Sequence, residues 1–213
     1  MTPGPRWFRT HDGGPHLAVP ADATAAWLTG QSSFRHSRLS PAQEAVLDDV
    51  AALGYDVVRA GLPYRATSVL APYRPEPIAS ASARNAAQLV AARTSRAFRA
   101  DVARHLRPLL ERTRRRLLLL CGSCGVELLA GALPELRVPP GLRLAVVALG
   151  PVGRCPEPGS GAPTLVVRGA RDRLSAWTCR APADVVVAGG HLDYAADTGA
   201  RAAVVRAARQ HLA

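Results

Sequence analysis

Lysine is absent from this sequence, so all 27 side chains counted as lysine or arginine are arginine. We attribute the absence to the coding bias of a GC-rich genome. Aromatic residues are also scarce, at 5%, and they are not interleaved with arginine as in proteins that stack nucleic-acid bases. Because helix-turn-helix and zinc-finger patterns are missing as well, we do not expect binding to nucleic acid, although the formal net charge is +11.

Long hydrophobic runs are missing too. A membrane-spanning helix needs about 20 consecutive apolar residues, and no run in the chain approaches that length. The N-terminal stretch MTPGPRWFRTHDGG has none of the apolar core of a signal peptide. We therefore expect a cytoplasmic protein with no membrane segment, in which the four cysteines are reduced thiols.

Arginine, by contrast, is plentiful and unevenly distributed. Ten of the 27 lie between Arg84 and Arg116, a segment that ends in RTRRR. One interpretation is a solvated helix face followed by a strand. The other is a docking surface for an acidic partner, such as an acyl carrier protein or a coenzyme A thioester. The sequence leaves both interpretations open.

Length and patterning indicate one domain. The 213 residues are 48% hydrophobic, enough for a sizeable core. Residues 1–22 are rich in Gly, Pro and His, and we expect them to form an N-terminal arm before a single catalytic domain at 23–213. Strands are expected within 23–30, 55–64, 114–125, 142–150, 161–172 and 183–191, with helices between them. This alternation predicts an α/β fold, a three-layer α/β/α sandwich with a mostly parallel central sheet.

Two helical segments have readable boundaries. In SPAQEAVLDDVAALG, Ser40 is suited to cap the N-terminus, Pro41 suits the first turn, and Gln43 stands three residues after the cap. A Pro- and Ser-rich connection, residues 65–83, precedes a helical region that begins at Arg84. In that region Pro108 is expected to kink or restart the helix.

The stretch LLLLCGSCGVELL, residues 117–129, has three interpretations. A zinc knuckle at its C-x-x-C would need a second ligand pair, whereas Cys155 and Cys179 stand far apart in the chain. A redox dithiol would need solvent access at a helix start, and the Trp that precedes such pairs in thioredoxins is missing. The third interpretation is a sharp strand-to-helix turn that presents a nucleophile.

Side-chain size around the turn favours Ser123 as that nucleophile. The residues two before and two after it must be small, because neighbouring backbone comes close. Around Ser123 these residues are Cys121 and Gly125. A frame centred on Cys124 would instead place the branched Val126 at the second position. The turn departs from the G-x-S-x-G pattern in carrying Cys at the first small position.

With this turn in place, residues 23–212 resemble a small, lidless serine hydrolase of the α/β-hydrolase superfamily. In that family a nucleophile, an acid and a base follow one another in the chain. The resemblance implies that Ser123 is the nucleophile, Asp172 in VVRGARD the acid, and His191 in VVVAGGH the base. Each also has a purely structural interpretation: a small residue in a turn, a helix cap and a loop histidine, respectively.

The resemblance further implies an oxyanion hole and a reaction. Its donors would be the backbone N–H groups of Cys124 and of Gln31, which follows the first expected strand. The implied reaction is cleavage of a small-molecule ester or thioester through an acyl-enzyme, with transfer of a carrier-bound acyl group as a variant. No cofactor or metal is implied. The alternative is a non-catalytic hydrolase-like protein that binds an acidic partner or ligand.

One departure from the family concerns the lid that often covers the active site. Residues 150–162 form a Pro/Gly-rich loop where most members carry a helix, and no lid insertion is apparent. Any cap over the site must therefore come from residues 65–83.

Overall fold

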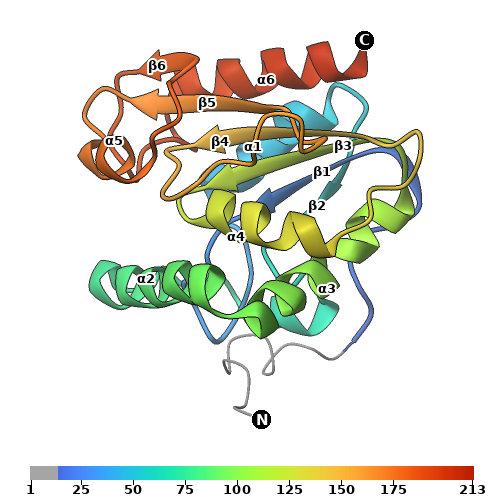
Figure 1. Ribbon diagram of the computed structural model, residues 1–213, viewed down its shortest axis with the longest axis horizontal. Helices are drawn as coiled ribbons and strands as arrows, with labels where there is room; N and C mark the ends of the chain where they lie inside the picture. The colour runs from blue at the N-terminus through green and yellow to red at the C-terminus, as the bar shows by residue number, and fades with distance from the viewer. Residues whose placement is uncertain (1–13) are drawn as a thin grey trace.

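The computed structural model describes residues 14–213 and contains a six-stranded sheet with the order β2-β1-β3-β4-β5-β6 (Figure 1). Every neighbouring pair in this sheet is parallel. The strands are β1 (Ala21–Leu28), β2 (Asp56–Val58), β3 (Thr113–Gly122), β4 (Arg143–Leu149), β5 (Thr164–Gly169) and β6 (Val185–Val187). The helices are α1 (Pro41–Ala51), α2 (Ile78–Thr94), α3 (Arg96–Arg112), α4 (Gly125–Ala132), α5 (Arg173–Thr178) and α6 (Thr198–Leu212), with 3₁₀ turns η2 (Ala66–Val69) and η3 (Leu133–Glu135).

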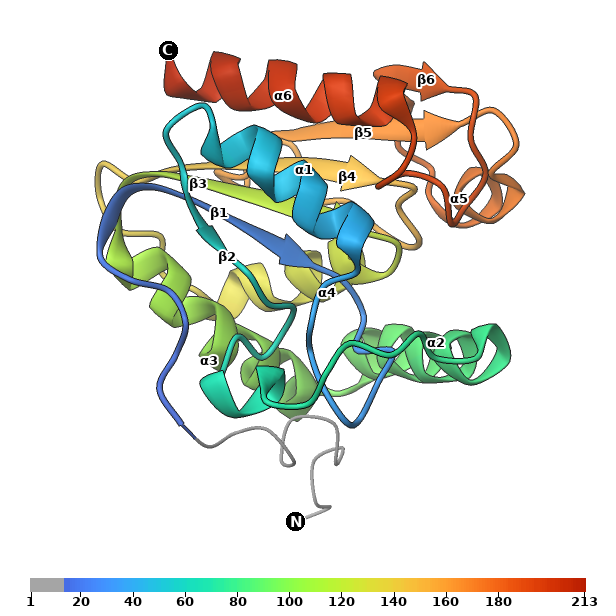
Figure 2. The same ribbon diagram turned by 180° about the vertical axis from the view of Figure 1, so that it is seen from behind.

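Helices cover both faces of the sheet, as its nearly continuous apolar strands require. In β3, Leu117 and Leu119 belong to the hydrophobic cluster formed with α3 and α4. The alternate residues Leu118 and Leu120 belong to the cluster formed with α1 and α6. Figures 1 and 2 view these two helix layers from opposite sides. The predicted fold class, a three-layer α/β/α sandwich around a parallel sheet, is confirmed.

The start of α1 follows the sequence pattern. Ser40 Oγ accepts a hydrogen bond from the backbone N–H of Gln43, and the Gln43 side chain accepts one from the N–H of Ser40. This reciprocal pair satisfies two of the N–H groups that a helix start leaves without partners. The cap also fixes the position of Gln43, which lines the pocket described below.

The arginine-rich helical region breaks at Ser95 rather than at Pro108, which corrects the prediction. Ser95 ends α2, and its side chain caps α3 by accepting from the N–H of Phe98. α3 then runs through Pro108. Its apolar face is buried on both sides of the proline, and the free energy gained by this burial exceeds the cost of the one backbone hydrogen bond lost there. α2 begins at Ile78, inside the connection expected to be irregular.

The predicted boundary between arm and domain falls inside β1, which begins at Ala21, two residues before position 23. The described residues before β1 also belong to the packed structure. The N–H of Leu17 donates to the carbonyl oxygen of Tyr64, and Ala18 is buried. The rest of the predicted arm, residues 1–13, lies outside the described residues.

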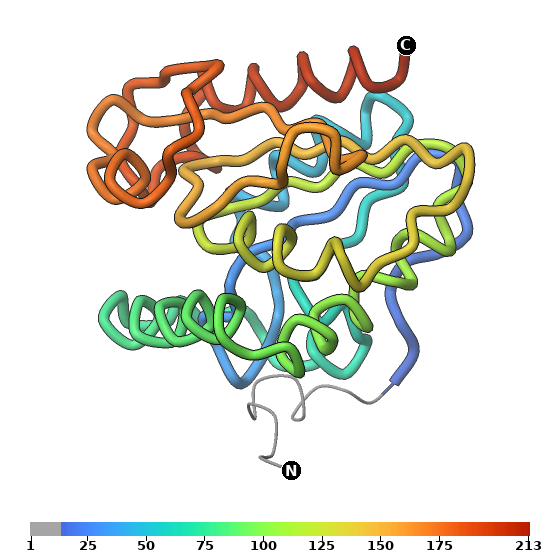
Figure 3. Tube along the Cα trace, in the orientation of Figure 1, coloured from blue at the N-terminus to red at the C-terminus, as the bar shows by residue number. Residues whose placement is uncertain are grey.

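The carboxyl ends of the parallel strands share one edge of the sheet. The chain between β5 and α6, including the short helix α5, gathers at that edge (Figure 3). α2 lies at the same end of the molecule (Figure 1). Parallel sheets commonly bind ligands beyond this edge. No helix within residues 14–213 is long and apolar enough to cross a membrane.

Candidate active site

Ser123 occupies the sharp turn between β3 and α4 in a strained backbone conformation. Its φ is 51°, in the left-handed region that side chains disfavour, whereas Cys124 has φ −69°. The strained position is therefore Ser123, the residue that side-chain size had singled out. A Cβ on Gly125 would collide with the carbonyl oxygen of Leu28. Glycine at position 125 thus allows α4 to pack against β1.

Ser123, His191 and Asp172 form one chain of hydrogen bonds. Ser123 Oγ lies 3.0 Å from His191 Nε2, and His191 Nδ1 lies 2.9 Å from Asp172 Oδ2. The serine follows β3, the aspartate follows β5, and the histidine follows β6. An ionised Asp172 can only accept, so the imidazole proton sits on Nδ1 and Nε2 accepts from the serine hydroxyl. The structure thus brings together the three residues that the sequence singled out.

Asp172 is almost completely buried, with 2% of its surface exposed, and both of its oxygens have partners. Oδ1 accepts from the N–H of Ser175 in α5, whereas Oδ2 accepts from the Tyr194 hydroxyl at 2.6 Å as well as from His191. Burial acts to raise the pKa of Asp172, but these hydrogen bonds outweigh it and lower the pKa below its usual value. Asp172 is therefore both the cap of α5 and the partner of His191, because each oxygen serves a different neighbour.

Tyr194 holds Asp172 in place, and sequence reasoning missed it. Its hydroxyl donates to Asp172 and accepts from the N–H of Gly169 at 2.7 Å, which ties the loop after β6 to the end of β5. Burial, together with the hydrogen bond to the carboxylate, raises the pKa of Tyr194, so the hydroxyl keeps its proton. The available signal was weak: a tyrosine three residues after His191 in a polar loop.

The C-x-x-C thiols are buried in the core rather than exposed as a redox pair. Cys121 and Cys124 have 0% and 1% of their surface exposed. Burial raises the pKa of Cys121, and it raises that of Cys124 to about 12. A reactive dithiol needs the opposite, namely solvent access and a lowered pKa. Within residues 14–213, no group of three or more His, Cys, Asp or Glu is arranged to hold a metal ion.

The backbone N–H of Gln31, expected to face the oxyanion, is engaged elsewhere in this structure. It donates to Oε1 of Gln88 at 2.9 Å, and Nε2 of Gln88 donates to the carbonyl oxygen of Gln31 at 2.9 Å. Gln88 lies in α2 and is fully buried, so it closes the Gln31 backbone off from a ligand. This corrects the expectation. The two residues are 57 positions apart, and no local pattern in the sequence connects them.

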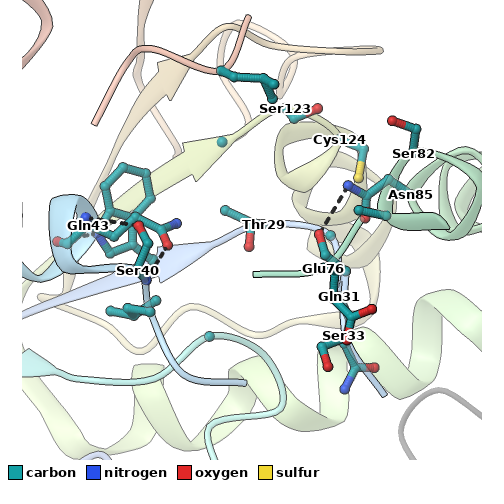
Figure 4. Close-up of a pocket in the computed structure, with 18 of the residues that line it drawn as sticks. Thr29, Gln31, Ser33, Ser40, Gln43, Glu76, Ser82, Asn85, Ser123 and Cys124 are labelled. Atoms are coloured by element: carbon teal, nitrogen blue, oxygen red, sulfur yellow. Dashed lines mark hydrogen bonds between the residues drawn. The ribbon is translucent and has the colours of Figure 1, made fainter. Parts of the chain in front are cut away.

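Two side-chain amides near the turn carry buried polar atoms without a hydrogen-bond partner among the described residues. They are both amide atoms of Gln31 and Oδ1 of Asn85. A Cβ on Gly30 would collide with the Asn85 amide and lie 2.5 Å from Cys124 Sγ, so both side chains pack against Gly30. Figure 4 shows Asn85 next to Cys124. Buried polar atoms are normally paired, so the unpaired amides leave capacity to bind a ligand.

These residues surround a pocket of about 670 Å³ that Ser123 and His191 line. α2 forms one wall, and α5 with the loop after β6 contributes to the other. Three apolar side chains at the pocket are largely exposed: Ile78 at 67%, Leu174 at 45% and Leu192 at 72%. The segment 65–83, considered above as a cap, contributes to the lining and continues into α2.

The arginine-rich segment lies mostly away from this pocket. Its last three arginines, residues 114–116, belong to the beginning of β3, whereas Ser123 follows the end of that strand. The strand between them is roughly 20–30 Å long. Arg84 and Arg93 are paired with Glu76 and Glu127. These positions favour the solvated-face interpretation over a docking surface at the pocket mouth.

No protein-family model matches the chain, and no curated protein matches it. Solved structures are similar in fold. Esterase PE8 aligns over 93% of this chain and 98% of its own, with a TM-score of 0.50 and 16% identity. A protein named as a hydrolase from Agrobacterium vitis S4 aligns over 92% of this chain and 91% of its own, with a TM-score of 0.51 and 15% identity. The chain has the α/β-hydrolase fold, as the resemblance implied.

Proposed function

We propose that this protein is a serine esterase that cleaves its substrate through an acyl-enzyme on Ser123. The observation that carries the proposal is the unbroken hydrogen-bond chain from Ser123 through His191 to Asp172, with the serine held at a positive φ. A serine needs an adjacent base to become nucleophilic at neutral pH, and this arrangement supplies one. The similarity in fold to a structure named as an esterase supports the same conclusion.

Each member of the chain has a defined role in the proposed reaction. His191 Nε2 takes the hydroxyl proton as Ser123 Oγ attacks the carbonyl carbon. Asp172 stabilises the resulting imidazolium, and its lowered pKa keeps it ionised at neutral pH. His191 then returns the proton to the leaving alcohol oxygen. In the second half-reaction it activates a water molecule, which releases the acid from Ser123.

The tetrahedral intermediate needs donors for its oxyanion. We assign one to the backbone N–H of Cys124, at the N-terminus of α4. We assign the second to the side-chain amide of Asn85 in place of the Gln31 backbone. Asn85 and Cys124 both pack against Gly30, and the Asn85 amide nitrogen makes a long contact of 3.4 Å to Ser32 Oγ, which a ligand oxygen can replace. The amide oxygen, which can only accept, lies toward Gly30 in this structure, so the proposed role requires the amide to rotate and point its nitrogen at the oxyanion.

The pocket favours an uncharged ester with an apolar group over a thioester presented by a large acidic carrier. Apolar side chains such as Leu89, Val152 and Leu174 line it. Its charged lining residues are of both signs, namely Arg38, Arg74 and Glu76. The last three arginines of the segment that suggested a carrier, residues 114–116, begin β3, at the far end of the sheet. The same nucleophile would attack a small thioester. The fit of the acyl and leaving groups to the pocket therefore decides the substrate class, and the relative cleavage rates of esters and thioesters measure it.

Hydrolysis of p-nitrophenyl esters of increasing acyl length, alongside an acyl-coenzyme A thioester, tests the proposal. We expect the esters to be the better substrates, with activity abolished in Ser123→Ala and His191→Ala and retained in Ser82→Ala. Ser82 also lines the pocket but takes no part in the hydrogen-bond chain. Folded wild-type protein that cleaves none of these substrates would contradict the esterase proposal. Faster cleavage of the acyl-coenzyme A would move the substrate class to thioesters.

A further inference from the structure

Two cysteines that are distant in the sequence meet beside the pocket. Cys155 lies in the loop between β4 and β5, and Cys179 directly follows α5. Their sulfur atoms are 3.7 Å apart, although the residues are separated by 24 positions. We propose that Cys155 and Cys179 form a disulfide when the protein meets a low-molecular-weight disulfide such as oxidised glutathione. This modification site is separate from the proposed esterase chemistry and does not depend on it.

The surroundings of the pair favour a thiolate. The hydrogen bond with Cys155 lowers the pKa of Cys179 against the opposing effect of burial, and the backbone of Ala181 and the Arg168 guanidinium contribute further. Arg168 also donates to the carbonyl oxygen of Cys179 at 3.1 Å, which holds this cationic group next to the sulfur. One proton is thus shared between two neighbouring sulfurs. The same hydrogen bond raises the pKa of Cys155, so Cys179 is the first of the two thiols to ionise. Transfer of the remaining proton from Cys155 to Cys179 then leaves the thiolate on Cys155, because either sulfur can donate in this contact.

Access distinguishes the members of the pair and sets the order of reaction. Cys155 is partly exposed, whereas Cys179 is buried with 2% of its surface exposed. An external disulfide can therefore reach Cys155 first. Cys121 and Cys124, by contrast, are both buried, and burial raises the pKa of each. Of the four thiols, the pair that looked conspicuous in the sequence is the less reactive one.

The exchange balances in two steps. The Cys155 thiolate attacks one sulfur of the small disulfide RSSR, which forms a mixed disulfide and releases RS⁻. The Cys179 thiolate then attacks the Cys155 sulfur, which forms the protein disulfide and releases a second RS⁻. Two protein thiols are oxidised, one RSSR is reduced to two thiols, and the two protons lost from the protein pass to the released thiolates or to solvent. The two sulfurs must approach from 3.7 Å to a bonding distance of about 2.05 Å.

The disulfide would fasten two segments that flank the hydrogen-bond chain. On one side, the loop that carries Cys155 also carries Val152, whose N–H donates to the carbonyl oxygen of Ser123 at 3.0 Å. On the other side, Cys179 ends the helix that Asp172 caps. A disulfide that closes the chain between Cys155 and Cys179 constrains the unfolded state, so we expect the melting temperature to rise by roughly 5–10 °C on oxidation.

Tryptic mapping after oxidation can identify the linkage, because the chain is cut on both sides of each cysteine segment. Cleavage at arginine places Cys155 in peptide 155–168, Cys179 in peptide 174–180, and the remaining two cysteines together in peptide 117–137. Folded protein is incubated with oxidised glutathione, free thiols are blocked, and the digest is analysed with and without dithiothreitol. The Cys155→Ser and Cys179→Ser variants are compared with Cys121→Ala, which removes a thiol outside the pair.

We expect peptide 155–168 linked to peptide 174–180 in the wild type and in Cys121→Ala, and the link absent from both serine variants. Dithiothreitol should release it and reverse the rise in melting temperature. Separate glutathione adducts on the two cysteines, a link to peptide 117–137 or between two copies of the chain, or unreacted thiols would overturn the proposal. Formation of the expected link without a change in melting temperature would overturn the inferred fastening of the two segments.

Discussion

The two walls of the pocket are built differently. On the wall of Ser123, Asp172 and His191, the functional polar groups are hydrogen-bonded, and each residue is anchored at the end of a strand. The opposite wall is α2, a 17-residue helix in which Gln88 and Ala92 are the buried residues. There the Asn85 amide has an oxygen without a partner among the described residues. The first wall is preorganised for the proposed chemistry, and the second has an unpaired acceptor to which a substrate can donate.

The largest expected difference between the walls is at Asp172. Asp172→Asn keeps the size of the side chain but permits the wrong histidine tautomer, so we expect kcat to fall roughly 10⁴-fold. Esterase kinetics measure the loss. Asp193→Asn, in the loop after β6, is the matched control. Asp193 accepts from the N–H of Gly190, and the structure shows no hydrogen bond between Asp193 and the His191 imidazole. Equal losses in both variants would mean that a loop change, rather than the tautomer, causes the effect.

On the α2 wall, Asn85→Ala tests the proposed oxyanion donor. Removal of one such donor typically lowers kcat by about 10²-fold, and we expect that loss with little change in melting temperature, since α2 is only lightly packed. Ser82→Ala, three residues earlier on the same helix, should leave kcat near the wild-type value. A normal kcat in Asn85→Ala would return the role of second donor to the Gln31 backbone, which would then have to leave Gln88 when substrate binds.

Gln88 tests whether α2 is held mainly by one side chain. Gln88→Met keeps the volume but leaves the N–H and carbonyl of Gln31 without their partners. We expect the free energy of unfolding to drop by about 2 kcal/mol, as measured by denaturant titration. Val90→Ala, at an exposed position of the same helix, should change it by less than about 0.5 kcal/mol. Similar small changes in both variants would show that α2 docks independently of the Gln88 bridge.

The smallest expected effect is at Tyr194, which donates a hydrogen bond to Asp172. Tyr194→Phe removes the hydrogen bond to Asp172 and the one from the N–H of Gly169, and loss of the first should bring the pKa of Asp172 closer to its usual value. A carboxylate with a lowered folded-state pKa stabilises the protein above its unfolded-state pKa, and this contribution is lost as the pH falls through the folded-state value. The variant should therefore lose about 1 kcal/mol at neutral pH and begin acid unfolding at a higher pH. An unchanged acid-unfolding curve would contradict the role of Tyr194.

The sequence predicts the first wall better than the second, for a physical reason. The small residues around Ser123 indicate that neighbouring backbone comes close at the turn. The positions of Asp172 and His191 in the chain indicate that each follows the end of a strand. The cap at Ser40 is likewise a local pattern. These features depend on residues within a few positions of each other, or on strand order.

The second wall depends on how α2 docks, which no local pattern encodes. The bridge between Gln88 and Gln31 joins residues 57 positions apart, and it overturned the expected oxyanion donor. The predicted break at Pro108 was wrong for a related reason, because burial of the α3 face outweighs the local helix-breaking preference of proline. Cys155 and Cys179 stand before and after β5 in the chain, and their contact is likewise a result of tertiary packing.

The central claim, an activated serine at position 123, is tested most directly with a fluorophosphonate probe followed by peptide mapping. We predict covalent labelling of Ser123 in peptide 117–137 of the wild type and no labelling in Ser123→Ala or His191→Ala. Circular dichroism of each variant establishes that it is folded. Folded wild-type protein that remains unlabelled, or labelling that persists on another serine when Ser123 is replaced, would contradict the claim.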